Sequence, residues 1–414
     1  MKRALCRLVL FALPLTSACP ANLTEATEVA EARLMGARVE VASDPTRTRP
    51  RLGEPFRLRQ FLALPGPLTT PLASRYSMSL AMCLGVKTPT GMLACLGDVR
   101  TTPVITPISE LELTLDGIVI DRSALSAVVD ALLPLLPAGS DPDAALAELM
   151  EGIDRIALFG TLCVDGRAEA VPGKTITADP PSQLFRCADN AASAFPDPNP
   201  FTLSVLLDRG RSGDDNHNPL FACDPAAAAS PCAVGVQHDD EPLVPGSFVL
   251  ARPKKKKSAD PREVVPWPAI DNNLALPWDS CVGNPSLLQV RVDSGEHTLR
   301  MRFDPGDRER YVEEIKVNGE PSMRETREAL AVTHAATTMG GSVGRFDSLL
   351  AADETDPNAE VSVGYTPPDS NGKGDHKVPE NGRLVRFYFT VRDQRGGIDY
   401  AVRELCLVPA ENQE

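Results

Sequence analysis

The chain of 414 residues carries 56 acidic against 42 basic residues, a net charge of −14, so nucleic acid and anionic lipid headgroups are disfavoured as partners. Its 38 prolines and few aromatic residues favour short strands and ordered turns over long helices. At this length the chain has room for two or three domains.

The N-terminus has the layout of an export signal. Three basic residues precede an apolar run, Leu8–Leu15, which is too short to span a bilayer. The sequence Leu-Thr-Ser-Ala-Cys that ends at Cys19 resembles the lipobox of bacterial lipoproteins, in which the cysteine is acylated and becomes the mature N-terminus; Thr16 stands where that family usually has an aliphatic residue. We therefore expect residues 1–18 to be a signal peptide and residues 19–36 to be a lipidated tether.

The alternative interpretation is an ordinary signal peptide, with Cys19 ending in a disulfide. Several acyl chains on one cysteine anchor a protein stably to a membrane, because each buried CH₂ contributes ~0.8 kcal/mol. No later segment has the ~18 continuous apolar residues of a transmembrane helix. We expect the mature chain to be tethered at the cell envelope, on the outer membrane or the periplasmic face, rather than embedded in a bilayer.

Cysteine usage agrees with export. Apart from Cys6 and Cys19, an even number remains, which in an exported chain indicates a disulfide framework. The candidates are Cys83, Cys95, Cys163, Cys187, Cys223, Cys232, Cys281 and Cys406. Eight cysteines allow 105 connectivities. We expect cysteines that are neighbours in the sequence to pair: Cys83–Cys95, Cys163–Cys187, Cys223–Cys232 and Cys281–Cys406. Zinc is disfavoured, because the sequence has no CxxC and its histidines are not at ligand spacing.

Alternating apolar and polar residues predict strands in a first β-rich domain, residues 37–198. The predicted strands are 37–42, 56–61, 76–83, 92–96, 111–115, 118–120 and 155–164. Asp116-Gly117, between two alternating runs, predicts a tight hairpin. Helical spacing with an Asp-Pro start predicts a helical insertion at about 123–152. A partner-binding helical hairpin is the functional alternative for that insertion.

A linker rich in Pro, Asn and Asp leads into a second domain, residues 199–412. Its predicted strands are 201–207, 288–292, 299–303, 361–365, 385–391 and 399–408. The turn Asp293–Glu296 predicts that the strands on either side of it form an antiparallel pair with one face in solvent. Regular short strands with polar turns, clearest at 285–410, predict a β-sandwich.

Four phrases in the last third of the chain resemble an immunoglobulin-like domain. They are EALAVT from Glu328, GRFD from Gly344, VGYTPP from Val363 and FYFTVRDQRGG from Phe387. More narrowly, they resemble the C-terminal Ig-like or PKD-like domain of uncharacterised lipoproteins of myxobacteria and their relatives. In related modules V-x-D-x-x-G-G closes the last hairpin of the sandwich. The resemblance covers Leu287–Val408, with Tyr365 where tryptophan is frequent, and it supplies no catalytic residue.

One motif points to an enzyme. Gly340–Gly344 matches the G-x-S-x-G nucleophile elbow, with Ser342 as nucleophile, and Asp347 and His376 follow in the order of a hydrolase triad. An elbow requires a strand before the serine and a helix after it, whereas the flanks here are rich in strand-forming residues. A hydrolase is therefore the alternative and not the main prediction.

Two loops concentrate the oxygen ligands that calcium prefers. The candidate ligands are Asp214 and Asp215 in the first loop and Asp353 and Asp356 in the second. Neither loop fits the EF-hand pattern, and Asx turns explain both equally well. Lys254–Lys257, a basic run in an acidic chain, is interpreted as a solvated loop, with an anion-binding patch as the alternative.

The sequence thus predicts a mainly β protein with two β-sandwich-like domains, the first with a short helical insertion and the second Ig-like. We expect a lipid-anchored, non-enzymatic binding or structural module of the cell envelope. An envelope protein or polysaccharide is the expected partner, nucleic acid is not, and calcium is the one cofactor considered. The alternatives are an envelope hydrolase that uses Ser342 and a calcium-dependent adhesive protein.

Overall fold

The computed structural model describes most of the chain between residues 29 and 410. The described residues are 29, 32–65, 76–87, 93–101, 104–109, 111–119, 141, 153–176, 179–189, 199–210, 216–221, 237–238, 243–253, 262–270, 280–317, 320–338, 342–347, 350–351, 359–368, 377–393 and 395–410. Within these ranges the structure is mainly β, as predicted, and no helix is long and apolar enough to cross a membrane.

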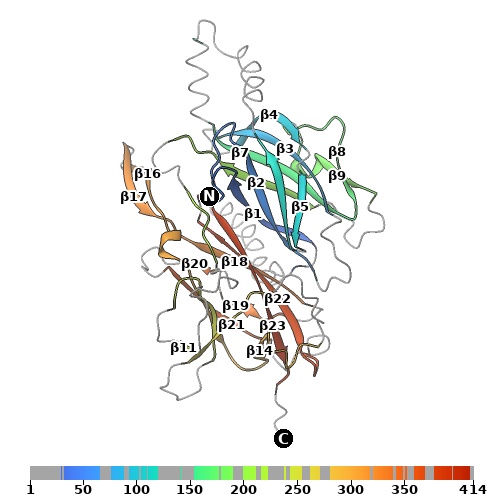
Figure 1. Cartoon of the computed structure of the whole chain (residues 1–414), viewed down its shortest axis with the longest axis vertical. Helices are drawn as coiled ribbons and strands as arrows, with labels where there is room; N and C mark the ends of the chain where they lie inside the picture. Colours follow the sequence, from blue (N-terminus) through green and yellow to red (C-terminus); the bar gives the residue numbers. More distant parts are fainter. Residues whose placement is uncertain are drawn as a thin grey trace, which may run out of the picture.

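Two four-stranded antiparallel sheets form a first sandwich (Figure 1). One sheet has the order β1-β2-β6-β5, with β1 Arg33–Val41, β2 Phe56–Ala63, β5 Val104–Ser109 and β6 Glu112–Ile118. The other has the order β10-β7-β3-β4, with β3 Tyr76–Lys87, β4 Leu93–Thr101, β7 Ile153–Val164 and β10 Asn199–Leu206. Leu58 of the first sheet and Leu80 of the second belong to one buried cluster, so the two sheets share a core.

Two larger sheets form a second sandwich. The six-stranded sheet has the order β11-β13-β12-β15-β21-β19, with β11 Gln237–His238, β12 Phe248–Ala251, β13 Glu263–Pro266, β15 His297–Arg302, β19 Arg345–Phe346 and β21 Glu360–Thr366. The five-stranded sheet has the order β14-β23-β22-β18-β20, with β14 Leu288–Arg291, β18 Ala331–Thr338, β20 Leu350–Ala351, β22 Arg383–Arg392 and β23 Ile398–Val408. Between them Trp267 packs edge-on against Phe387 and donates a 2.8 Å hydrogen bond to the Glu404 carbonyl.

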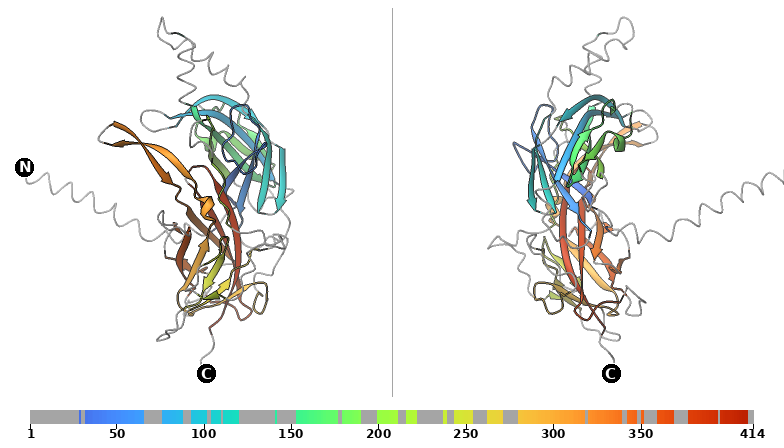
Figure 2. Two further views of the ribbon diagram at one scale, coloured as in Figure 1. Left: turned by 60° about the vertical axis from the view of Figure 1, so that its left-hand side comes forward. Right: turned by 90° about the vertical axis from the view of Figure 1, so that its right-hand side faces the viewer.

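Smaller elements complete the described chain. β8 Arg167–Ala170 pairs with β9 Phe185–Ala188, and short 3₁₀ turns lie at Pro181–Gln183 and Pro305–Asp307. β16 Arg310–Val317 and β17 Glu320–Arg327 pair only with each other and form a ribbon that stands away from both sandwiches (Figure 2).

The long hairpin β22–β23 joins the two sandwiches. It extends from the second sandwich, at the bottom of Figures 1 and 2, into the first sandwich above it. One face of β22 contributes Phe387 and Phe389 to the second core, whereas Tyr388 on the opposite face belongs to the first core. Tyr400 of β23 stacks on Phe61 of β2 with ring centroids 4.7 Å apart. Both faces of this hairpin are therefore buried, which explains why the polar residues of β22 that alternate with its apolar ones, Arg386 and Thr390, are buried as well.

The expected hairpin at Asp116-Gly117 is wrong. β6 continues through both residues, and Ile118 still pairs with Phe56 of β2. Gly117 takes a positive φ of 74° at a register irregularity between these strands, so the glycine accommodates a bulge and not a reversal of the chain. The partner of β6 on its other side is β5.

Two expected boundaries also need correction. The tether was expected to reach residue 36, but β1 begins at Arg33, and the Val29 side chain is buried in the first core. The second domain was expected from residue 199, but β10 pairs with β7 along its whole length, which places this strand in the first sandwich.

The expected antiparallel pair around the turn Asp293–Glu296 is wrong as well. β14 pairs in parallel with β23, whereas β15 pairs with β12 and β21 in the opposite sheet. The turn therefore crosses between the two sheets. Alternation shows which side chains face the core, and both strands do face the same core, but it does not show in which sheet each strand lies.

Candidate functional site

Two of the predicted disulfides are present, Cys163–Cys187 and Cys281–Cys406. Cys83 in β3 is also disulfide-bonded, and the β3–β4 register places Cys95 opposite Gly85. The candidates Cys19, Cys223 and Cys232 lie outside the described residues.

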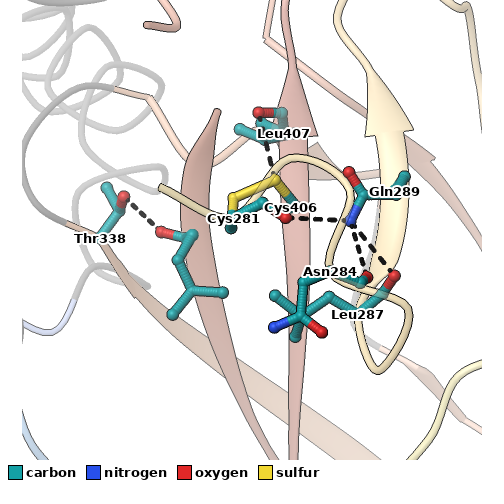
Figure 3. The surroundings of a disulfide bond; sticks show 8 residues. Cys281, Asn284, Leu287, Gln289, Thr338, Cys406 and Leu407 are labelled. Atoms are coloured by element: carbon teal, nitrogen blue, oxygen red, sulfur yellow. Dashed lines mark hydrogen bonds between the residues drawn. A yellow bond between two sulfur atoms is a disulfide. The ribbon is translucent and has the colours of Figure 1, made fainter. Parts of the chain in front are cut away.

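The Cys281–Cys406 bond fixes the segment that leads into β14 (Figure 3). Cys281 precedes β14, and Cys406 lies in β23 directly opposite Gln289. The Gln289 amide nitrogen lies 3.3 Å from the carbonyl oxygens of Cys281 and Asn284, both of which accept hydrogen bonds from it (Figure 3). Because covalent and hydrogen bonds hold this short edge strand, one wall of the adjacent cavity is preformed.

That cavity is a cleft of about 680 Å³ where β12 and β13 of one sheet face β14 and the end of β23 of the other. We call it the β13–β14 cleft. Its lining residues are Leu250, Arg252, Pro253, Val265, Leu288, Gln289, Val290, Arg291, Asp293, Ser294, His297 and Val408. The volume falls within the ~300–1,000 Å³ typical of small-molecule sites. The β13–β14 cleft is therefore the candidate binding site.

Apolar residues form the floor and walls of the cleft. Leu250 and Val290, only 2% and 1% exposed, belong to the second core and also line the cleft. Val265 pairs with Leu250 in register and is half-buried, as are Leu288 and Val408.

A serine and a histidine lie together in the cleft. Ser294 Oγ is 2.7 Å from Nε2 of His297, whose side chain comes from the start of β15 and is only 6% exposed. Burial, together with the positive charge of Arg252, lowers the pKa of His297 to about 4, so the ring is neutral at neutral pH. Its Nδ1 is buried, with no hydrogen-bond partner within the described part of the chain.

This pair has the spacing of a nucleophile and its base but lacks the third group of a triad. A catalytic histidine is normally oriented by an acceptor on its second nitrogen. No such acceptor meets Nδ1 of His297 among the residues described. A neutral, weakly basic imidazole in this setting is suited to hydrogen bonding with a ligand.

Charged side chains surround the mouth of the cleft. Arg252 and Arg291 bring two positive charges against one negative charge from Asp293. Arg252 is largely exposed and lies 3.3 Å from the exposed carboxylate of Glu263. Among the lining residues positive charges therefore exceed negative charges by one, and the neighbouring Glu263 balances that excess.

The structure places Ser342 in an irregular segment, with Gly344 at a positive φ of 86°, that leads directly into β19. Gly344 N–H donates a 3.3 Å hydrogen bond to Ser342 Oγ, and a strand, not a helix, follows. The environment therefore lacks the strand–turn–helix of a nucleophile elbow. Asp347 is exposed beside β21, whereas His376 lies outside the described residues.

The other predicted candidates fall outside the described residues: Asp214, Asp215, Asp353, Asp356, Lys254–Lys257 and, except for Asp141, the helical insertion. Across the ranges that are described, no cluster of three or more His, Cys, Asp or Glu side chains could hold a metal ion.

The D-x-x-G-G phrase of the β22–β23 hairpin has a structural role. Asp393 Oδ1 accepts hydrogen bonds from the backbone N–H groups of Arg395 and Gly397 at 2.7 and 2.9 Å. A Cβ on Gly397 would lie 2.7 Å from the backbone oxygen of His217, so only glycine fits there. The aspartate and the glycine together close the hairpin.

A buried charge cluster lies beside that turn. The Arg395 guanidinium contacts the carboxylates of Glu328 and Glu309 and stacks over the Tyr311 ring at 4.4 Å. Burial, with the nearby acid Asp393, raises the pKa of Glu328 to about 8. The cluster fixes the base of the β16–β17 ribbon to the hairpin, and we assign it to stability.

Sequence reasoning missed the cleft residues Arg252, Ser294 and His297. The turn at 293–296 was predicted, but no local pattern distinguishes its serine from any other turn serine. No family model matches the chain, and no curated protein matches it in sequence.

Proposed function

We propose that this protein is an exported lipoprotein, held at the cell envelope through Cys19, that acts as a non-enzymatic binding module. The disulfides Cys163–Cys187 and Cys281–Cys406 support export, because such bonds persist in oxidising compartments. The observation that carries the binding role is the β13–β14 cleft, a preformed and largely apolar cavity with a few convergent polar groups.

The second sandwich is, in this proposal, an Ig-like domain. Its resemblance phrases fall on β18, β19, β21, β22 and the turn that leads into β23, which are among the strands of its two sheets. Sandwiches of this kind carry many functions, so the ligand must be inferred from the cleft and not from the fold.

Intact mass spectrometry of the mature protein, extracted from membranes with and without reduction, tests the anchor. We expect a mass that begins at Cys19 with acyl chains and that gains about eight hydrogens on reduction, two for each of four disulfides. A mature protein that is neither acylated nor membrane-bound would contradict the envelope-anchored function.

A hydrolase is the second candidate, favoured by the 2.7 Å contact between Ser294 and His297 in the cleft and by the sequence motif at Ser342. Generic ester substrates assayed with the variants Ser294→Ala and Ser342→Ala separate the two functions. A binding module predicts no rate that depends on either serine. An ester hydrolysis rate abolished by one of these substitutions would replace the binding proposal with an enzymatic one.

A further inference from the structure

We propose that the β13–β14 cleft takes a single-chain amphiphilic anion, with its apolar chain along Leu250, Val265 and Val290 and its acidic head between Arg252 and Arg291. This inference rests on the proposed binding function and adds the chemical class of the ligand. Three features of the described structure support it.

The first feature is the apolar floor. Leu250 and Val290 continue the second core into the cleft, and Val265 and Leu288 extend that surface toward solvent. An apolar chain bound there would remove these side chains from water, and that driving force grows with the length of the chain. A purely polar ligand, such as a free sugar, would leave this surface without a matching partner.

The second feature is the sign of the charge at the mouth. Two arginines face one aspartate among the lining residues, although Glu263 offsets part of the charge of Arg252. The protein as a whole repels anions because its net charge is −14. The two arginines therefore favour an anionic head at this place over the rest of the surface.

The third feature is the buried histidine of the lining. His297 is more than nine-tenths buried, and its unpartnered Nδ1 lies in a ring that lines the cleft. Ser294 Oγ is within hydrogen-bond distance of the other ring nitrogen. A buried polar group without a partner is costly, so such a group at a cavity wall is a sign of a site built for a ligand.

Isothermal titration of the full chain carrying Cys19→Ser, exported so that its disulfides form, measures this binding. The probes are dodecanoate, dodecyltrimethylammonium and decanoate, each below its micelle-forming concentration, and dodecanol below its solubility limit. We expect dodecanoate to bind about tenfold more tightly than dodecanol, and the cation to bind more weakly than dodecanol. Removal of two CH₂ groups, in decanoate, should weaken binding by about tenfold.

Three variants locate the ligand. Val265→Trp fills the cleft and should abolish binding of every probe, and Leu288→Trp provides a second filled cleft if the first variant misfolds. The double variant Arg252→Gln/Arg291→Gln should weaken dodecanoate by about tenfold and leave dodecanol unchanged. Arg345→Gln, an exposed arginine on the far-edge strand β19, is the matched control and should change nothing.

The outcomes separate this inference from the function on which it rests. Equal affinity for dodecanoate and dodecanol, with both lost in Val265→Trp, would overturn the anionic head and leave the binding module intact. Binding that persists in both Val265→Trp and Leu288→Trp would show that the probes do not bind in the β13–β14 cleft. Wild-type protein that binds none of the four probes would overturn the ligand class. The binding module itself would fail only if native mass spectrometry with a small-molecule extract of the cell envelope also showed no adduct.

Discussion

The Tyr388 hydroxyl of β22 donates a 2.9 Å hydrogen bond to the carbonyl oxygen of Leu64, and it accepts a 3.2 Å hydrogen bond from the N–H of the same residue. Tyr388 lies on a strand of the second sandwich, with its side chain in the first core, and Leu64 follows β2 of the first sandwich. Neither side chain is exposed. One buried phenol therefore forms hydrogen bonds with both backbone groups of Leu64. These two bonds join the second sandwich to the first, and we call them the Tyr388 joint.

Tyr388→Phe should destabilise the protein by about 1–3 kcal/mol, because it leaves the N–H and the carbonyl of Leu64 buried without this partner. The free energy of unfolding in urea, compared with wild type, measures the loss. A change of less than about 0.5 kcal/mol, the range usual for surface substitutions, would show that the joint contributes little to stability.

The two disulfides should differ in their effect on stability. Cys281→Ala/Cys406→Ala opens a link between residues 125 apart in sequence, and Cys163→Ala/Cys187→Ala opens one between residues 24 apart. The chain-entropy relation gives losses of about 5 and about 3.5 kcal/mol, respectively. Denaturation of both double variants under oxidising conditions tests the order, and a larger loss for the shorter loop would contradict it.

Glu328→Gln should change how stability depends on pH. The pKa of Glu328 is raised to about 8 by burial and by Asp393, against the opposing charge of Arg395, whereas the ordinary value is 4.5. Between these values the unfolded chain has lost this proton and the folded chain keeps it. The contribution to stability is therefore full below about 4.5 and is lost as pH rises to about 8, by at most about 1.4 kcal/mol per pH unit.

In Glu328→Gln that decline should disappear, so the variant gains stability relative to wild type as pH rises from 5 to 8. Urea denaturation at both values gives the difference. Wild type and variant with parallel pH profiles would show that this carboxyl does not hold its proton in the folded protein. Glu325→Gln, an exposed carboxylate on the β16–β17 ribbon, is the matched control and should leave the profile unchanged.

His297 should act in the opposite direction. Burial and Arg252 lower its pKa from 6.5 to about 4, so the folded chain loses this proton more readily than the unfolded chain. Its stabilising contribution is full above about 6.5 and is lost as pH falls through about 4. His297→Gln should therefore lose less stability than wild type between pH 6.5 and 4, as measured by thermal unfolding; an unchanged acid profile would contradict the buried neutral ring.

The sequence predicted local structure better than it predicted pairing. Alternation identified β22, and the turn after it identified β23; the antiparallel pairing of the two strands is confirmed. Cysteine order predicted Cys163–Cys187 correctly, since the two residues lie on neighbouring parts of the first sandwich. The strand prediction depends on the pattern of neighbouring residues, and the disulfide prediction depends on an even number of cysteines and their order in the sequence.

The failures arose where tertiary contacts decide the outcome. Asp116-Gly117 has the composition of a tight turn, yet continued pairing with β2 keeps the strand going. The alternating runs around Asp293–Glu296 face one core from two sheets, which periodicity does not reveal. The cleft could not be predicted for the same reason, because it brings together Leu250 of β12 and Val408 of β23, far apart in the sequence.

Native mass spectrometry of the protein after equilibration with a small-molecule extract of the cell envelope tests the binding function most directly. A binding module with this site predicts a small-molecule adduct on wild-type protein that is absent from Val265→Trp and retained by the control Arg345→Gln. Wild-type protein without an adduct, or the same adduct on wild type and Val265→Trp, would contradict a binding module whose site is the β13–β14 cleft.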